Sequence, residues 1–239
     1  MSFWQPRRRG LRAFGLAFAL APALLLAASA PARATADAAG EWSGFVGLEV
    51  RAFANDGAFA GQGENFTGSL VFEPEYFREW NGGRDRAVAK AFLRLDSADD
   101  ERSHVDLREL YWQRVGDGYE LDVGVRTVFW GVAESLHLVD IVNQTDLVED
   151  LDGEDKLGQP MVRLGLSRPW GYLELFLLPG FRERTFPGVD GRLRPSPIID
   201  TTAGYASSAG DGHVDAALRY SHVLGDVDLG VTYFRGTSR

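Results

Sequence analysis

Apolar and polar residues alternate along nine stretches of this chain, and the alternation predicts nine β-strands. Successive side chains of a strand point to opposite faces, so a period of two indicates a sheet with one apolar and one polar face. The clearest example is 119–129, whereas 105–115 mixes polar and apolar residues on both faces. The predicted strands are 42–53, 66–75, 87–96, 105–115, 119–129, 162–167, 173–177, 214–221 and 226–233.

The connections between these stretches differ in length. Short turns occupy 116–118, 168–171 and 224–226, whereas long polar loops occupy 131–159 and 181–212. Short turns at one end of the hairpins and long loops at the other end are typical of outer-membrane β-barrels. The longer predicted strands, at about nine to eleven residues, also match the length that crosses a bilayer at a tilt. We therefore expect an all-β fold, an antiparallel up-and-down transmembrane β-barrel.

Aromatic residues gather near the ends of the predicted strands, as they do in the interfacial girdles of membrane barrels. They are Trp42, Phe53, Tyr119, Phe129, Trp130, Trp170, Tyr172, Tyr233 and Phe234. The alternative is a soluble periplasmic β-sandwich that binds a ligand, because sandwiches also show alternation and glycine-rich turns. The strand lengths, the aromatic positions and the asymmetry of the loops favour the barrel.

The first 34 residues have the features of a cleaved signal peptide. Arginines at positions 7–9 and 12 precede an Ala/Leu-rich stretch, and Ala32-Arg33-Ala34 places small residues where a signal peptidase cleaves. An uncleaved anchor is the alternative, since the stretch approaches the roughly 18 residues of a spanning helix. Its alanine content and Pro22 favour cleavage, which leaves 35–239 as the barrel segment.

Charge and composition exclude several functions. Removal of residues 1–34 takes away five arginines and no acid, so the formal net charge moves from −9 to −14. Nucleic acid is therefore not an expected partner, because phosphate contacts need Lys and Arg. The chain has no Cys, which excludes disulfides and thiolate chemistry. After Ala34 no apolar run is long enough for a spanning helix, so the mature chain would have to cross a membrane as strands.

The order of the connections implies a topology. With the mature N-terminus in the periplasm, every short turn, including 77–86, faces the periplasm and both long loops face outward. Nine strands conflict with the even strand numbers of bacterial single-chain barrels, and the chain ends on Arg239 rather than on an aromatic residue. We expect the chain to be the N-terminal part of a larger barrel. A miscounted strand at 66–75 or 105–115 is the alternative.

Two short motifs resemble a known family. Residues 124–134 read G-V-R-T-V-F-W-G-V-A-E, and residues 140–146 read D-I-V-N-Q-T-D. Together with 107–111 and 233–236, they resemble a family of Gram-negative porin-like outer-membrane proteins of largely unassigned function, whose pattern is G-x-R-x-x-x-W-G followed by D-x-x-N-x-x-D. The resemblance is good over about 105–165, implies a barrel longer than this chain and supplies no substrate. Gln144 departs from the family, in which Pro more often follows the Asn.

The motifs also have a physical interpretation. Trp130 would end a strand at the membrane interface, Gly131 would allow a sharp turn, and 134–142 has the spacing of a short helix. Asn143 and Asp146 suit a helix end and a turn. The loop would either fold into the lumen and narrow it or lie on the outer surface. The candidate constriction residues are Trp130, Gly131, Glu134, Asp140, Asn143 and Asp146.

Other candidate chemistry has little support. The acidic segment 149–155 offers oxygen ligands of the kind that calcium prefers, but its spacing does not match a calcium loop, and a solvated acidic loop is favoured. Ser135 and His137 lie near Asp140 and Asn143 without a nucleophile elbow, so an outer-membrane barrel hydrolase is a minor alternative. The other histidines have no metal-ligand spacing. We predict no catalytic residue, no metal site and no cofactor.

Charged residues on the polar sides of the strands form the main candidate site. They would line the lumen and either pair to brace the wall, which we favour, or select solutes by their field. These candidates are Lys90, Arg94, Glu120, Asp122, Arg126, Arg163, Glu174, Asp215 and Arg219. The predicted function is passive passage of small polar solutes across the outer membrane, with membrane lipid and the barrel-assembly machinery as partners.

Overall fold

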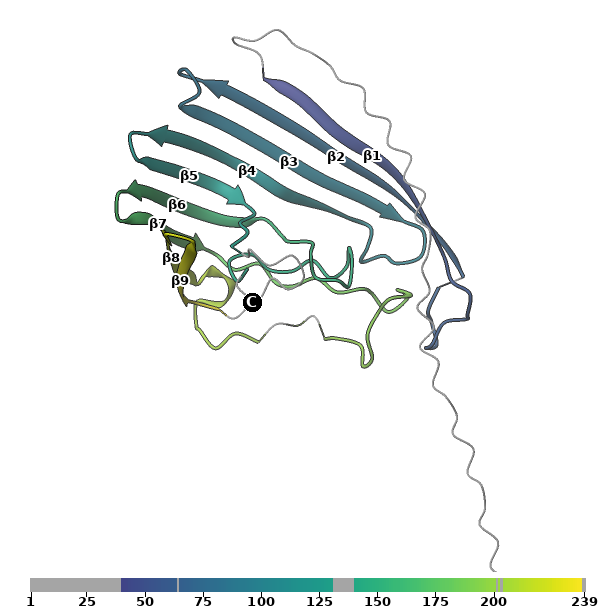
Figure 1. Ribbon diagram of the computed structural model, residues 1–239. Coiled ribbons are helices and arrows are strands. Elements are labelled where there is room, and N and C mark those ends of the chain that lie inside the picture. Colours follow the sequence, from purple (N-terminus) through teal and green to yellow (C-terminus); the bar gives the residue numbers. More distant parts are fainter. Residues whose placement is uncertain (1–39, 64, 131–139, 201, 203, 238–239) are drawn as a thin grey trace, which may run out of the picture.

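The fold is one antiparallel sheet of nine strands in sequence order (Figure 1). The computed structural model describes residues 40–63, 65–130, 140–200, 202 and 204–237. The elements are β1 (Glu41–Ala52), β2 (Phe66–Trp80), β3 (Asp85–Asp96), β4 (His104–Gly116), β5 (Tyr119–Arg126), β6 (Gln159–Arg168), β7 (Gly171–Pro179), the 3₁₀ turn η1 (Gly210–Gly212), β8 (Val214–Leu224) and β9 (Val227–Arg235). The predicted all-β, up-and-down arrangement of nine strands is confirmed.

The connections alternate between short and long, as the sequence predicts. β2–β3, β4–β5, β6–β7 and β8–β9 are joined by tight turns, and the other connections are longer. Antiparallel pairing places the tight turns at one end of the sheet and the long loops at the other end. Asn81, Gly118 and Gly225 have φ angles of 54°, 69° and 64°, which tight hairpin turns require and which glycine and asparagine tolerate best.

β2 continues five residues beyond its predicted end at Glu75. Pro74 has no backbone N–H, and the pairing with β3 is interrupted there, between the pairs Phe72–Leu93 and Glu75–Lys90. The strand nevertheless continues, because pairing with β3 resumes at Glu75 and reaches Trp80. Proline thus weakens the ladder without ending the strand.

A β-bulge in β4 explains why 105–115 carries mixed residues on both faces. Lys90 of β3 pairs with Glu109, but Ala91 pairs with Leu107, so Arg108 is an extra residue. The extra residue shifts the alternation by one position. The outward apolar residues are odd-numbered before the bulge, as at Leu107, and even-numbered after it, as at Leu110.

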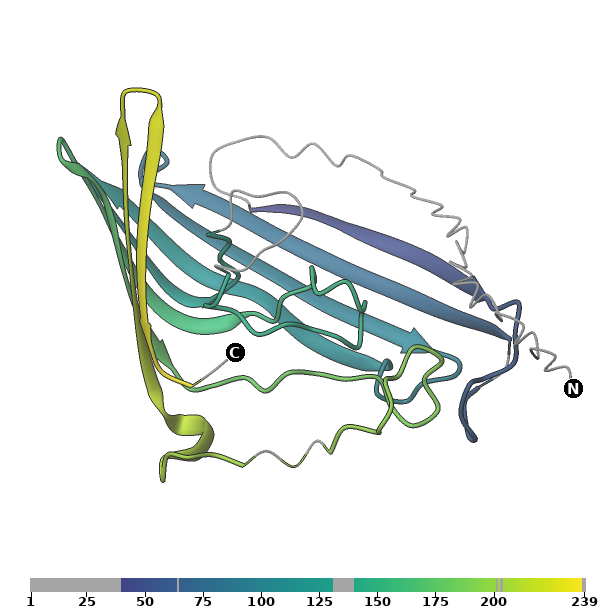
Figure 2. The same ribbon diagram turned by 60° about the horizontal axis from the view of Figure 1, so that its bottom comes forward.

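The two faces of the sheet differ in chemistry and in cover. One face, here called the apolar face, is uncovered: Trp42, Val105 and Tyr233 are 66%, 72% and 61% exposed. The other face, the polar face, carries the charged side chains, and the long loops lie in its hollow (Figure 2). Several charged residues on this face are buried, including Arg94, Asp122 and Arg163. The burial pattern is therefore the reverse of that in a soluble sheet protein.

The sheet is open. The strand order runs from β1 to β9, and within the described residues neither of these two edge strands pairs with a second neighbour. No helix in the described part of the chain is long and apolar enough to cross a membrane. A small apolar core lies on the polar-face side of β6–β8, under the loop that follows β5; it comprises Trp130, Val142, Met161, Phe176, Leu178 and Ala217.

Candidate functional site

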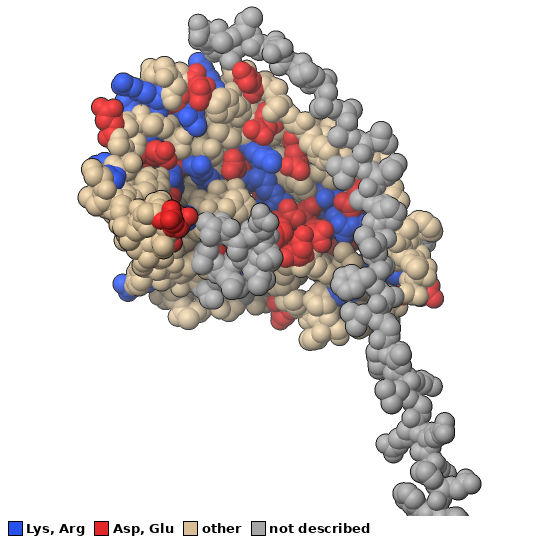
Figure 3. Space-filling model, in the orientation of Figure 1, with Lys and Arg blue, Asp and Glu red and all other residues tan. Residues whose placement is uncertain are grey.

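Two loops cover the polar face and make it the candidate site. The inner loop, residues 140–158, follows β5 and precedes β6; the crossing loop, residues 180–213, joins β7 to β8. All nine charged candidates from the sequence lie on the polar face. Figure 3 shows basic and acidic side chains side by side across this hollowed face. Whether the charges are free or paired decides what the face can do.

Asn143 joins the inner loop to the end of β5. Its side-chain oxygen accepts the N–H of Val128 at 2.9 Å, and its side-chain nitrogen donates to the carbonyls of Arg126 at 2.8 Å and Leu157 at 2.9 Å. The amide thereby satisfies backbone groups where the strand ladder stops at Arg126 instead of at the predicted residue 129. Asn143 is thus a buried anchor in the described structure, whereas the sequence indicated a helix end.

Asp140 and Asp146 are anchors as well. Asp140 accepts the N–H of Trp130. Asp146 is fully buried and pairs with Arg108 Nη2 of β4 at 2.7 Å, and it accepts the hydroxyl of Thr185 in the crossing loop. The D-x-x-N-x-x-D motif therefore links the inner loop to the sheet and to the crossing loop.

Backbone pairing shapes the middle of the inner loop into a hairpin, residues 144–157. Thr145 and Lys156 form an antiparallel bridge, Asp146 N donates to Asp155 O at 2.8 Å, and Leu157 N donates to Gln144 O at 2.9 Å. The tip of this hairpin lies beside β3 and the β3–β4 turn. Asn143 and Asp146 hold the base of the hairpin, so the contacts at the tip determine where it rests.

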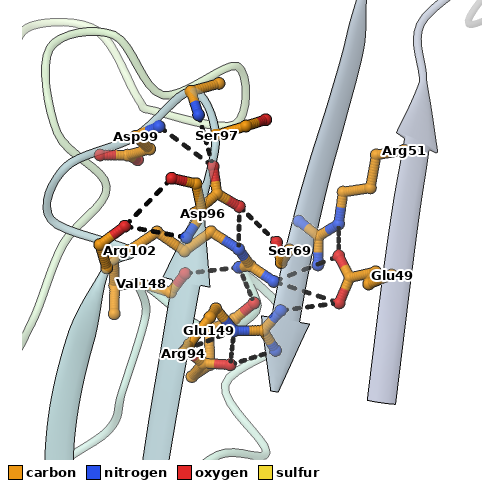
Figure 4. A network of polar contacts seen from close by, with 12 residues as sticks. Glu49, Arg51, Ser69, Arg94, Asp96, Ser97, Asp99, Arg102, Val148 and Glu149 are labelled. Atoms are coloured by element: carbon orange, nitrogen blue, oxygen red, sulfur yellow. Dashed lines mark hydrogen bonds and ion pairs between the residues drawn. The ribbon is translucent and has the colours of Figure 1, made fainter.

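Glu149 fixes the tip through Arg94 of β3 (Figure 4). Arg94 Nε donates to both carboxylate oxygens at 3.0 and 2.8 Å, and Nη2 lies 2.6 Å from Oε2. Arg94 Nη1 also pairs with Glu49 of β1 at 2.9 Å. Glu149 is only 5% exposed, so the prediction of a solvated acidic segment is wrong at this position. The neighbouring Asp150 and Asp152 are exposed, as that prediction requires.

Arg102, in the β3–β4 turn, holds the same tip by its backbone. Nη1 donates to the carbonyls of Val148 at 2.7 Å and Glu149 at 2.5 Å. Nε pairs with Asp96 at 3.2 Å, and Nη2 pairs with Glu49 at 3.2 Å. Burial is the largest cause that lowers the pKa of Arg102, and the charges of Arg51 and Arg94 lower it further. The acidic partners compensate a guanidinium that would otherwise be costly to bury.

The crossing loop runs from β7 across the polar face toward β4 and the β3–β4 turn. Arg182 pairs with Asp106 of β4 at 2.6 Å and donates to Gly158 O at 2.9 Å. Farther along, Gly188 N donates to the carboxylate of Asp99 at 3.1 Å. Burial raises the pKa of Asp99. The crossing loop thus contacts both the inner loop and the β3–β4 turn.

A second ion-pair network lies on strands β5, β6 and β7. Arg163 pairs with Asp122 at 2.8 Å, with Glu174 at 2.8 Å and with Glu120 at 3.2 Å. Arg126 pairs with the same Asp122 within β5. The contacts of Arg163 join neighbouring strands side by side, which is the bracing arrangement that the sequence favoured.

Two of the remaining charged candidates are less tightly held: Arg219 lies 3.9 Å from Glu174, and Lys90 lies 3.3 Å from Glu73. Asp215, by contrast, is fully buried, contacts His213 Nδ1 at 2.6 Å and accepts the N–H of Thr237 at 3.1 Å. The charged candidates thus separate into a tightly paired set and a set with looser contacts.

A hollow of about 340 Å³ remains between the polar face of the sheet and the hairpin. Its sheet side includes Glu73, Lys90 and Glu109, and its loop side includes Asp155 and Lys156. Because the hairpin forms one side of this space, the resting position of the hairpin sets the width of the space.

Several residues of this site were not among the sequence candidates: Glu49, Arg102, Arg108, Glu149 and Arg182. Glu49 could have been found, because its place in the alternation of strand 42–53 puts it on the polar face. Arg108 was hidden by the bulge, and Arg102, Glu149 and Arg182 lie outside strands, where no periodicity applies.

Some predictions lie outside the described residues. They concern the signal peptide (1–34), Gly131 and Glu134 of the constriction set, and Ser135 and His137 of the hydrolase alternative. Most of the helix expected over 134–142 also falls there. Within the part that the structure describes, no group of three or more His, Cys, Asp or Glu side chains is arranged to hold a metal ion.

Comparison with known proteins identifies no relative. No protein-family model matches the chain, and no curated protein or solved structure is significantly similar to it. The resemblance of segments 124–134 and 140–146 to a porin-like family therefore stays a prediction, and function has to be inferred from the polar face and the loops on it.

Proposed function

We propose that this chain forms the wall of a transmembrane β-barrel in the outer membrane and that the barrel lets small polar solutes diffuse across. The observation that carries the proposal is the reversed burial of the sheet. Large apolar side chains are exposed along the outward face of the strands, and charged side chains are buried on the inward face. A sheet between lipid and a wet lumen needs this arrangement.

The extent of the apolar face supports a lipid environment. Soluble monomers rarely expose contiguous apolar patches larger than a few hundred Å². Every strand contributes at least one outward apolar residue that is about 40% exposed or more; β3 and β4 contribute Leu95, Val105 and Leu110. In water such a face would drive aggregation, whereas in a bilayer it is solvated by lipid tails.

The β-sandwich alternative lacks the second layer that it needs. In a sandwich the apolar side chains of two sheets face each other. Among the described residues there is a single sheet, and the loops lie on its polar face. A ligand-binding sandwich would therefore have its core exposed, which favours the barrel.

The edges of the sheet also favour closure. Soluble proteins protect edge strands with Lys, Pro or a covering segment. β1 and β9 contain neither Lys nor Pro. Pairing of both edges with further strands would close the barrel and would satisfy their unpaired backbone groups, in agreement with the expectation of a larger barrel.

A fractionation and permeability experiment tests the proposal. The full-length protein should sediment with outer membranes, require detergent for extraction and, when reconstituted into liposomes, allow swelling in small sugars. Recovery of the mature protein as a monomer dissolved in the periplasm without detergent would overturn the barrel. Membrane location without any permeability would overturn the passage alone.

A further inference from the structure

We propose that Glu149 is the positioning residue that holds the 144–157 hairpin against the wall and so sets the upper size limit for passing solutes. The inference rests on the proposed passage function and adds a size-determining element to it. Glu149 does not itself contact the solute in this proposal; it acts by fixing the hairpin.

The hairpin is held unequally at its two ends. Its base is fixed by Asn143, with three hydrogen bonds to backbone groups, and by Asp146, which pairs with Arg108. At the tip the wall is reached through Glu149, whose carboxylate pairs with Arg94, and through the carbonyls that Arg102 holds. Release of the tip would leave the base in place and let the hairpin swing from the wall.

Arg94 and Arg102 both contact Glu49 of β1, and Glu149 is the loop residue on which the same two arginines converge. Arg94 binds its carboxylate and Arg102 binds its carbonyl, so one loop residue occupies two buried guanidinium groups (Figure 4). His104 Nε2 lies 3.5 Å from the same carboxylate. These three partners lie on β3, on β4 and in the turn between them. The tip is therefore fixed relative to a rigid part of the wall.

The position of the hairpin matters because the hairpin bounds the space that remains open. Asp155 and Lys156 of the hairpin face Glu73 and Glu109 of the wall across the hollow of about 340 Å³. A docked hairpin leaves room for a small solute in this space. Release of the tip would move the arm of the hairpin that reaches the hollow at Glu154 and would widen the hollow on the side of the tip, so larger solutes would pass.

Removal of the carboxylate charge is expected to release the tip. In E149Q, Arg94 keeps its pair with Glu49 but loses the carboxylate of the hairpin, and the loss of one partner from a buried ion pair is unfavourable. For E149Q we expect the ratio of released to docked hairpin to rise by about 100-fold. R102K is a second variant, because it keeps the positive charge but loses the paired contacts to the two carbonyls.

The experiment measures the size limit in liposomes that contain the full-length protein. Swelling rates are recorded in a series of neutral sugars, from monosaccharide to tetrasaccharide, for the wild type, E149Q, R102K and D150N. D150N is the matched control, since it removes the same charge from the adjacent, exposed residue of the same tip. Heat-dependent mobility on gels confirms that each variant is folded, a property that swinging of the hairpin does not change.

The expected result is that E149Q and R102K admit larger sugars than the wild type, while D150N keeps the wild-type limit. Folded E149Q with the wild-type limit would overturn the proposal. If E149Q does not assemble, the limit of R102K decides in the same way. A wild-type protein that passes no sugar would instead contradict the proposed function, so the two failures are distinguishable.

Discussion

The two halves of the polar face use buried ion pairs for different purposes. On β5–β8, Arg163 pairs with Asp122 and Glu174, which lie on the two neighbouring strands. On β1–β4, Arg94 pairs with Glu149, a loop residue 55 positions away in sequence. The same chemistry thus joins neighbouring strands in one half and joins a loop to the sheet in the other half.

The difference follows from what else covers each half. The β5–β8 half packs an apolar core that includes Met161 and Phe176 beneath Trp130 and Val142. The β1–β4 half contributes no residue to that core, and its buried arginines meet the tip of the hairpin instead. A loop held by polar contacts can be released without dismantling the sheet, whereas strand-to-strand pairs belong to the wall itself.

The largest expected effect comes from breaking the wall network. In R163M two buried carboxylates lose their shared guanidinium, and Asp122 is fully buried. We expect a loss of about 3–5 kcal/mol in the free energy of unfolding. Urea unfolding in liposomes, followed by tryptophan fluorescence, measures the loss. R168M at the exposed β6–β7 turn is the control, and equal stability of both variants would show that the network does not brace the wall.

Charged substitutions on the apolar face should destabilise both halves alike, because lipid would contact both. L48R on β1 and L175R on β7 each place a charge outward, which costs about 2–4 kcal/mol near the bilayer midplane. T232R on the polar side of β9 is the control, since that side chain would enter the lumen. Urea unfolding in liposomes measures all three, and unperturbed L48R and L175R would contradict contact with lipid.

Asn143 lies at the junction of the two halves, and its removal should have an intermediate effect. N143A leaves the carbonyls of Arg126 and Leu157 without a donor, and each buried unsatisfied group costs about 1–3 kcal/mol. We expect the free energy of unfolding to fall by about 2–3 kcal/mol in total. The rate of proteolysis of the inner loop is the sensitive measurement. N65A, which removes one exposed hydrogen bond, should be neutral; equal effects of the two would show that Asn143 is no anchor.

The smallest expected effect is the pH dependence of stability that comes from Asp99, in the β3–β4 turn. Burial raises the pKa of Asp99, so its contribution to stability is present below its unfolded pKa and is lost as pH rises through its folded pKa. D99N should abolish this loss, and the effect should be the smallest of the four because it comes from a single partly buried carboxyl group. Unfolding free energies across the acidic range, with D100N as the exposed control, provide the measurement. Identical pH profiles for D99N and the wild type would refute the assignment.

The strands could be predicted because their signal is local. Alternation in stretches such as 119–129 located all nine strands and assigned the charged candidates to one face. The β4 region resisted this reasoning, since the extra residue Arg108 shifts the alternation partway along the strand. The end of β2 was misplaced because Pro74 is tolerated where one ladder hydrogen bond is given up.

The loop contacts could not be predicted from the sequence. Glu149 lies among other acids in 149–155, and nothing in that segment distinguishes it from the exposed Asp150. Its burial depends on Arg94 and Arg102, which reach it only after β3, β4 and the inner loop are assembled. A solvated and a buried carboxylate can therefore have the same sequence surroundings.

Periodicity along the chain was sufficient to predict the number of strands and the chemistry of each face, because the direction of a side chain in a strand depends only on its position in a period of two. The short turns between the stretches predicted the order of the strands. The partners of the charges, the path of the loops and the width of the remaining hollow required the folded arrangement. Those properties depend on distances between residues far apart in sequence, and such distances are set when the curved sheet brings its polar face around the loops.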